Sequence, residues 1–471
     1  MLEPDGPFAF ELDRSDERSL AEQLQQRLRA AIEAGQLQSG ARLPSWRDLA
    51  AQLGVARGTV RAAYERLVDA RLITASGAAG THVAGTPPPR VRRARAAAPS
   101  DLALVYSAPP LPFQMGVPAQ DAFPAKLWAR VSTASARAEA FAPATYADPR
   151  GEPALREQIA AYLAIARGLR CAPEQVFVTN GFRGGLRLAL DVLRVAGRTA
   201  WIEEPSFPLT RAGLAAAGLT PVAIDVDAEG LDVAEGLARA PDAAVVVVTP
   251  GQQAPLGVAL SPRRRQALLR WAKRADAWVI EDDYLGELQL DGRAAPALAA
   301  TDPAGRVLHV GTFSKTLSPA LGVGFLVTPP ALAERAAHVA GCLAPAPARA
   351  TQLALATLLR DGHFLRHLRR MKRLYRARRD ALLARLGGGK AAGLAVLWDL
   401  PPGADDRAIA RAAQARGIAP VPLSPWFTRA ARPGLLLGVS TVAEDRLEAA
   451  CAALLDVTAL WNGERAWARS S

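Results

Sequence analysis

The chain has 471 residues, and at about 100 to 200 residues per domain this length predicts two or three folded units. Half of the residues are hydrophobic and 22% are charged, which excludes a disordered or collagen-like chain. No apolar run approaches the roughly 20 residues that span a bilayer, and no secretory signal is expected from the acidic start. Three scattered cysteines exclude a disulfide framework, so we expect a cytoplasmic protein without membrane contact.

The formal net charge is +12 and the isoelectric point is near 10.3, which favours a polyanionic partner such as nucleic acid. The alternative is that the high content of Ala and Arg, and with it the positive charge, only reflects the base composition of the gene. Only five of the 57 basic residues are lysines, so the position of each lysine is informative.

The first 84 residues predict three helices and a hairpin. Apolar residues recur at helical spacing from Leu20 to Ile32, a second helix begins at Ser45, and a third runs from Arg57 to Ala70. Alternation from Leu72 to Val83, around Gly77 and Gly80, predicts two strands. This order is typical of a winged helix-turn-helix, a small α+β domain.

A linker rich in Pro and Arg is expected over residues 85–105, between a DNA-binding domain (1–84) and a large domain (106–471). In the large domain, strand-like and helical stretches alternate, which predicts a mostly parallel α/β sheet followed by a smaller C-terminal lobe. The expected buried strands are 176–179, 199–203, 243–249, 278–281, 307–310 and 325–327.

Arginines and hydroxyl residues lie where a winged helix-turn-helix contacts DNA. Three of them open the third helix, one opens the second helix, and two lie near the hairpin tip. The candidate DNA-binding residues are Arg47, Arg57, Thr59, Arg61, Thr81 and His82. By charge alone, exposed arginines on a solvated surface are the commoner explanation.

The ordered motifs of this segment resemble the GntR type of winged helix-turn-helix. They comprise Gly40 to Ser45, Arg47 to Ala50, Leu53 to Val60 and Ala63 to Leu67. The resemblance covers residues 19 to 84 and implies binding to operator DNA. Trp46 and Ala56 stand at positions where that family often has small or hydroxyl residues. These two differences bear on which DNA sequence is preferred.

In the large domain, Lys315 follows an expected strand within Thr312-Phe313-Ser314-Lys315-Thr316-Leu317. A lysine at a strand end can form a Schiff base with an aldehyde cofactor, although a lone Ser-Lys pair is more often a surface feature. Asp282 and Tyr284 end another strand, where an acid can pair with a pyridine nitrogen and a tyrosine can bind a ring hydroxyl. The alternative is that Asp282 and the acids beside it only cap the end of the strand.

The large domain resembles the fold-type I, pyridoxal-phosphate-dependent aminotransferases, and the whole chain resembles the MocR/GabR regulators, from about residue 19 to 440. Motifs that carry this likeness are Tyr146 to Gly151, Thr249-Pro250, Glu281 to Tyr284, Gly311 to Leu317 and Gly362-His363. The resemblance implies a homodimer and a role for each of several residues. Lys315 would be the Schiff-base lysine, Asp282 the pyridinium partner and Tyr284 the ligand of the ring hydroxyl. Phe207 would lie on the ring face, Tyr146 on the phosphate of the neighbouring subunit, and Gly181 and Ser314 around the phosphate.

Two arginines of that family are absent. Gly322 stands in place of the arginine that clamps the phosphate, and Leu436 in place of the arginine that binds a substrate carboxylate. Because a bidentate arginine is a strong anion contact, both losses weaken the case for catalysis. Arg183 is a candidate for restoring the phosphate contact, and Arg429 or Arg432 for reaching a carboxylate.

The segment from Arg360 to Arg385 contains ten basic residues and only two acidic residues. Such an excess is more typical of a solvated helix than of a nucleic-acid contact. His363 and His367 share a helix face, but without a third ligand we expect no metal site.

These features favour a transcriptional regulator whose large domain senses an amino compound or pyridoxal phosphate itself. The alternatives are an active aminotransferase with an added DNA-binding arm, and a regulator whose vestigial pocket serves only dimerisation. The missing arginines make an enzyme the less favoured choice.

Overall fold

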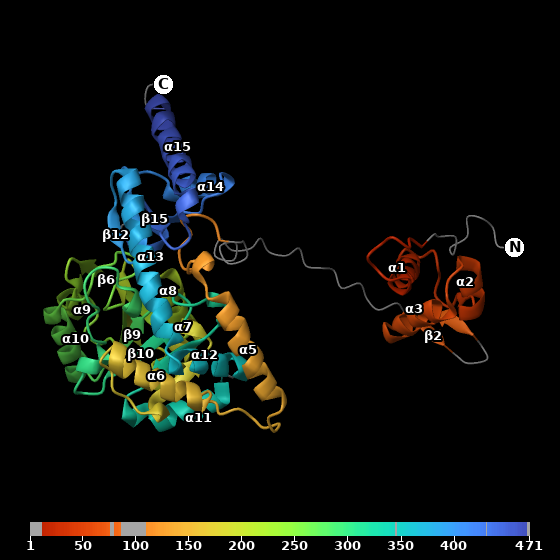
Figure 1. Ribbon diagram of the computed structural model, residues 1–471, viewed down its shortest axis with the longest axis horizontal. Helices are drawn as coiled ribbons and strands as arrows, with labels where there is room; N and C mark the ends of the chain where they lie inside the picture. The colour runs from red at the N-terminus through yellow and green to blue at the C-terminus, as the bar shows by residue number, and fades with distance from the viewer. Residues whose placement is uncertain (1–11, 76–79, 86–109, 344–345, 430, 469–471) are drawn as a thin grey trace. The chain divides into compact units, whose positions relative to one another are not determined.

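The computed structural model describes residues 12–75, 80–85, 110–343, 346–429 and 431–468 of the chain (Figure 1). These residues fall into two compact units, 1–108 and 109–471. Most of the linker expected over 85–105 lies outside the described residues, so its extent stays a prediction. None of the described helices is long and apolar enough to cross a membrane.

The first unit contains the three expected helices, α1 (Leu20–Glu33), α2 (Trp46–Leu53) and α3 (Arg57–Asp69). Short-range signals fix their ends. Ser19 forms a capping box with Glu22, and the Ser45 hydroxyl accepts a hydrogen bond from the amide of Asp48 at the start of α2. Apolar side chains from all three helices form one small core.

Three short strands complete this unit, β1 (Arg42–Leu43), β2 (Ile73–Ala75) and β3 (Thr81–Val83), in the order β1-β3-β2. The expected hairpin is therefore present, although its predicted tip, including Gly77, lies outside the described residues. Strand β1 was not expected, because two residues are too few to show an alternation. This arrangement is the winged helix-turn-helix.

The second unit is built on a sheet of eight strands in the order β4-β11-β10-β9-β8-β5-β6-β7. The five central strands from β10 to β6 are parallel, while β4, β11 and β7 run antiparallel to their neighbours. The strands are β4 (Val176–Thr179), β5 (Thr199–Glu204), β6 (Thr220–Asp227), β7 (Gly230–Leu231), β8 (Val245–Val248), β9 (Trp278–Asp283), β10 (Val307–Thr312) and β11 (Gly324–Val327). The mostly parallel α/β sheet is confirmed, with β6 and β7 added at one edge.

Helices cover both faces of this sheet. On one face α7, α8 and α11 supply an apolar layer, and on the other face α9 and α10 do so. On the second face the rings of Trp201 and Trp271 stack with their centroids 3.9 Å apart. The helices of this lobe are α5 (Ala125–Ala140), α6 (Pro153–Ala166), α7 (Gly181–Leu193), α8 (Pro208–Ala216), α9 (Val233–Arg239), α10 (Pro262–Arg274), α11 (Ala333–Leu343) and α12 (Arg349–Arg360).

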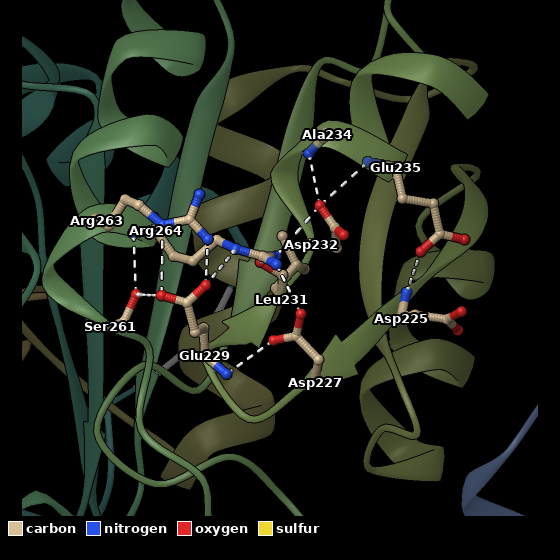
Figure 2. Close-up of polar contacts among 10 residues, drawn as sticks. All are labelled: Asp225, Asp227, Glu229, Leu231, Asp232, Ala234, Glu235, Ser261, Arg263 and Arg264. Carbon is tan, nitrogen blue, oxygen red and sulfur yellow. Dashed lines mark hydrogen bonds and ion pairs between the residues drawn. The ribbon is translucent and has the colours of Figure 1, made fainter.

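Polar contacts tie α10 to the β6–β7 edge (Figure 2). The buried guanidinium of Arg264 donates to the Leu231 carbonyl at 2.7 Å and pairs with Asp227 and Asp232. Asp232 in turn caps α9 by accepting from two backbone amides. One arginine thus joins two helices and a hairpin at the edge strand.

The smaller C-terminal lobe holds an antiparallel sheet in the order β12-β13-β15-β14, packed against three helices. Its strands are β12 (Lys390–Ala392), β13 (Ala395–Asp399), β14 (Val421–Pro422) and β15 (Gly434–Gly438). Its helices are α13 (His363–Leu386), α14 (Asp406–Ala415) and α15 (Glu444–Ala468). In Figure 1, α13 extends from this lobe alongside the large sheet.

The basic helix α13 uses several arginines for internal contacts. Arg376 donates to the Leu290 carbonyl, Arg378 donates to the Ser440 carbonyl at 2.7 Å, and Arg379 pairs with Asp291. These contacts hold the helix to both lobes, so the three arginines have a structural role in place of the solvated position that the sequence favoured.

Candidate cofactor and DNA-binding sites

Polar side chains gather at the carboxyl ends of the parallel strands of the large sheet, which is where ligands bind in open α/β folds. Lys315 follows β10, and its Nζ donates to the carbonyl oxygen of Gly116 at 2.7 Å. Burial lowers the pKa of the Lys315 amine, and the nearby carboxyl of Asp282 only partly opposes this effect. A larger fraction of the amine is therefore neutral, the form that attacks an electrophile.

The loop around Lys315 is fixed by hydrogen bonds. The Ser314 amide donates to the Thr312 hydroxyl at 3.2 Å, and that hydroxyl donates to Ser314 Oγ at 3.0 Å. His367 of α13 holds the next turn, with Nε2 placed 2.8 Å from the Thr316 carbonyl. This carbonyl requires a donor, so the ring contributes an N–H and serves the loop rather than a metal.

Asp282, near the end of β9, is 7% exposed, and its buried Oδ1 has no hydrogen-bond partner in the described part of the chain. Burial raises the pKa of this carboxyl well above its usual range, and the carboxyls of Asp283 and Glu203 add to the rise. An unpartnered buried carboxylate oxygen is costly, which favours a ligand that donates a hydrogen bond there.

Behind Asp282 lies a buried charge network. Asp283 accepts from Arg167 Nε at 2.7 Å, and Glu281 lies 3.0 Å from Nδ1 of His309. Burial opposes ionisation of Glu281, but His309 and two backbone amides hold the pKa of this carboxyl well below its usual range. The network satisfies the acids on either side of Asp282 and leaves Asp282 as the unpaired one.

Glu203, at the end of β5, belongs to the same group and was not recognised in the sequence. Its carboxylate accepts from the Thr249 hydroxyl at 2.6 Å and from the Thr249 amide at 3.2 Å. Burial raises the pKa of Glu203 to about 7. An acid that ends a buried apolar strand was the available signal, because strand ends of one parallel sheet converge.

Aromatic side chains form one wall of the site. Tyr284 follows β9, and Phe207 caps the start of α8, where its ring lies 5.6 Å from the ring of Trp426. Both side chains pack against an apolar cluster that includes the fully buried Leu436 of β15. A planar ligand would meet hydrocarbon and aromatic surface on this side.

Two of the residues assigned to the phosphate, Gly181 and Arg183, lie in the first turn of α7. Gly181 has a φ of +65°, a Cβ added to it would meet no atom within 4 Å, and Arg183 is exposed. Gly322 ends a short helix in the left-handed conformation that favours glycine, at φ +62°. Tyr146 is fully exposed in the single chain.

The two arginines considered for a carboxylate lie near other acids. Arg429 pairs with Asp225 and with Glu235, the latter at 3.1 Å. Arg432 lies 3.9 Å from Asp399. Arg429 is therefore engaged by two acids away from this site, whereas the exposed Arg432 makes only a distant approach to Asp399.

On the winged helix-turn-helix, the first turns of α3 present exposed Arg57 and Arg61 together with partly exposed Thr59. Arg57 forms no ion pair with any residue that the structure describes, whereas Arg61 pairs with Glu65 at 2.8 Å. The exposed guanidinium of Arg47 lies over the Trp46 ring, 4.8 Å from its centroid.

At the wing, Thr81 and His82 are partly exposed on β3. A Cβ on Gly80 would lie 3.1 Å from Nε of Arg42. Arg42, opposite His82 across the β1–β3 pair, therefore adds a cation beside the wing that the sequence interpretation had left out.

Two family patterns match the chain. The bacterial regulatory proteins of the gntR family match residues 20–83, and the class I and II aminotransferases match residues 118–453. The boundaries of the two matches agree with the two compact units.

Named transcriptional regulators match the chain over most of their length. The chain is 35% identical to the probable rhizopine catabolism regulatory protein MocR of Rhizobium meliloti over 455 residues, 92% of each chain. It is 32% identical to the pyridoxine biosynthesis transcriptional regulator PdxR of Corynebacterium glutamicum, covering 95% of this chain and 98% of that one. It is 33% identical to the transcriptional regulator TauR of Rhodobacter capsulatus, covering 84% and 87%.

Among solved structures, the second unit is similar to aminotransferases. The α-aminoadipate aminotransferase LysN of Thermus thermophilus superposes with a TM-score of 0.67 and 26% identity, covering 75% of this chain and 93% of that one. The kynurenine aminotransferase of Pyrococcus horikoshii, at 24% identity and a TM-score of 0.68, has the same fold.

Proposed function

The chain belongs to the MocR type of transcriptional regulator, in which a GntR-type winged helix-turn-helix precedes a class I and II aminotransferase domain, and we propose that it regulates transcription in the cytoplasm in response to a small amino compound or pyridoxal phosphate. The observation that carries this proposal is that one chain contains both an exposed basic helix in a DNA-binding fold and a strand-end site around Lys315.

The DNA contact is proposed to centre on the start of α3. Arg57, Thr59 and Arg61 lie within its first five residues, where side chains and free amides of a recognition helix meet base edges and phosphates. Arg47 at the start of α2 would contact the phosphate backbone, and Thr81 and His82 on the wing would approach the adjacent groove.

The large domain is proposed to hold pyridoxal phosphate, and the residues present fit this group. Lys315 supplies a buried amine of lowered pKa, and the unpartnered Oδ1 of Asp282 suits a protonated ring nitrogen. Tyr284 and Phe207 would bound the ring. When bound, the cofactor would supply an electrophilic aldehyde carbon to Lys315.

The phosphate would lie at the start of α7, where backbone amides favour an anion. Gly181 leaves the approach to this helix open, Ser314 would donate its hydroxyl, and Arg183 would supply the positive charge that Gly322 cannot. Within one chain, the proposed phosphate contacts thus come from the first turn of α7 and from the loop after β10.

Sensing is proposed rather than turnover. Steady transamination requires the phosphate to stay anchored while the Lys315 amine leaves and returns. Gly322 and Leu436 provide no guanidinium at either end of the site. A ligand that binds one arrangement of the protein better than another would still shift its occupancy of DNA.

A homodimer is proposed as the working form. Tyr146 and Phe141 are large side chains that are exposed almost completely in the single chain, Phe141 at 90%. Large exposed apolar side chains commonly mark interfaces. Tyr146 from a second copy would then be free to reach the phosphate, as its role in related proteins implies.

Footprinting of the DNA upstream of the protein's own gene tests the regulatory proposal. We expect protection of a discrete site, changed in extent or affinity by pyridoxal phosphate. Arg57→Ala should weaken binding by about 10-fold and reduce the slope of log affinity against log salt by about 1, since one phosphate contact is lost. Arg29→Ala on α1 is the matched control, because Arg29 pairs with Glu33. Equal losses in both variants would contradict the assignment of α3.

An absorption spectrum tests the cofactor proposal. Protein mixed with pyridoxal phosphate should show a long-wavelength band from the lysine-bound cofactor, and Lys315→Ala should lose it. Lys273→Ala, an exposed lysine on α10, should keep the band. Absence of the band from the unmodified protein would refute cofactor binding through Lys315.

A further inference from the structure

No arginine occupies the usual place of a carboxylate-binding residue on β15. Leu436 is fully buried there, opposite Leu397 of β13, and is packed among Leu423, Trp426 and other apolar side chains. A ligand carboxylate placed on this surface would lose its hydration without gaining a donor.

The nearby arginines of the small lobe do not compensate. Arg429 is held by Asp225 and Glu235, two acids at the β6–α9 edge that Figure 2 shows beside each other. Arg432 lies close to Asp399. Both guanidinium groups therefore already have acids nearby.

Arg211 differs from both. It lies on α8 one turn after Phe207, and its Nη2 donates to the Pro425 carbonyl at 3.3 Å. Its Nη1 is buried and has no hydrogen-bond partner, and the side chain forms no ion pair with any residue in the described ranges. A buried guanidinium N–H without an acceptor is costly, and an anionic ligand oxygen would satisfy it.

A second unpartnered group lies on the same short segment. Ser206, directly before Phe207, is 4% exposed, and its hydroxyl has no hydrogen-bond partner among the residues that the structure describes. The Ser206 amide donates to the Trp426 carbonyl at 3.0 Å, so both residues flank Phe207 and both contact the 3₁₀ helix Ser424–Trp426 of the small lobe.

We propose that Arg211, assisted by the Ser206 hydroxyl, binds the carboxylate of the effector at the junction between α8 and this 3₁₀ helix. The effector is then an amino acid rather than a simple amine. This inference rests on the proposed sensing function and specifies its ligand. Because Arg211 also contacts the small lobe, a carboxylate bound there links the two lobes.

Calorimetric titration of the full chain, with and without pyridoxal phosphate, tests the inference with matched probes. The pairs are L-leucine with isoamylamine, L-phenylalanine with phenethylamine, and β-alanine with ethylamine, which differ only in the carboxylate. In at least one pair the acid should bind 10- to 100-fold more tightly than the amine, as expected for a charged hydrogen bond.

Arg211→Met should lower the affinity for that acid to the affinity for its amine, while amine affinity changes less than about 2-fold. Arg211→Lys should keep part of the preference. Arg429→Met is the matched control and should keep all of it, because Arg429 is paired elsewhere. Inorganic phosphate and pyridoxal phosphate alone should bind Arg211→Met and the unmodified protein equally, which separates a carboxylate site from a phosphate site.

The inference is overturned if no pair shows a preference for the acid, or if Arg211→Met discriminates as the unmodified protein does. A loss of phosphate binding in Arg211→Met would also overturn it, by assigning Arg211 to the cofactor. Footprinting measures DNA binding separately, so failure of the proposed function remains distinguishable from failure of this site.

Discussion

Glu203 allows a quantitative test of the buried acids in the candidate site. Its carboxyl is 5% exposed, and burial raises its pKa from 4.5 to about 7, although Thr249 and Gln253 donate hydrogen bonds to it. Glu203→Gln removes the titration and keeps a similar volume and an acceptor for the Thr249 amide.

The magnitude follows from proton linkage. At 1.36 kcal/mol per pKa unit, a rise from 4.5 to about 7 corresponds to roughly 3 kcal/mol. The folded chain binds this proton more tightly than the unfolded chain, so the stabilisation is complete below pH 4.5 and is lost as the pH rises through 7. Between about pH 5 and about pH 8, the unmodified protein should lose roughly 2 to 3 kcal/mol relative to Glu203→Gln.

Urea denaturation followed by tryptophan fluorescence measures this difference. Trp201 lies two residues before Glu203 on β5 and stacks on Trp271, so the fluorescence includes a signal from the large sheet. A Trp46→Phe background removes the tryptophan of α2 in the DNA-binding unit from that signal. Glu157→Gln, an exposed carboxylate on α6, is the charge-matched control and should differ from the unmodified protein by less than about 0.5 kcal/mol. Stability curves of Glu203→Gln and the unmodified protein that run parallel across this pH range would refute the reasoning.

Three further substitutions test other features of the site. Asp282→Asn should weaken pyridoxal phosphate binding by about 10- to 100-fold in a spectroscopic titration, because the ring nitrogen loses a charged partner; unchanged affinity would contradict that role. Arg167→Met should destabilise the large unit by about 3 to 5 kcal/mol in urea, since Asp283 becomes an uncompensated buried charge. Gly311→Ala should cost at least about 2 kcal/mol by the same measurement, because its Cβ would lie 2.1 Å from the Phe325 ring, and an unchanged urea midpoint would show that the ring moves away freely.

Much of the fold was predictable because its signals are local. Ser45 caps α2 and Gly54 ends it through hydrogen bonds that span a few residues, so these boundaries can be identified from the sequence alone. The apolar runs 243–249 and 307–310 were identified as buried strands because both faces of a parallel sheet are covered, and the structure has strands at Val245–Val248 and Val307–Thr312. Strand β6, which lies next to the short edge strand β7 and has a mixed pattern of exposure, had no comparably clear signal.

The position of Lys315 after a strand was also predictable, because the strand before it is a local signal, whereas its role as a cofactor lysine followed from the resemblance of the surrounding motif to the aminotransferases. Asp282 and Tyr284 were recognised for the same reason, since they stand two positions apart in the sequence at the end of a strand.

The sequence by itself thus determined the two-domain order, the type of sheet and the Lys315 motif. Only the tertiary structure decided which charged groups are paired. Arg429 meets Asp225 from 204 positions away, whereas the buried Nη1 of Arg211 meets no acceptor. The physical reason is that the charge, pKa and free hydrogen-bonding capacity of a buried group depend on which distant segments pack around it, and no local pattern encodes that packing.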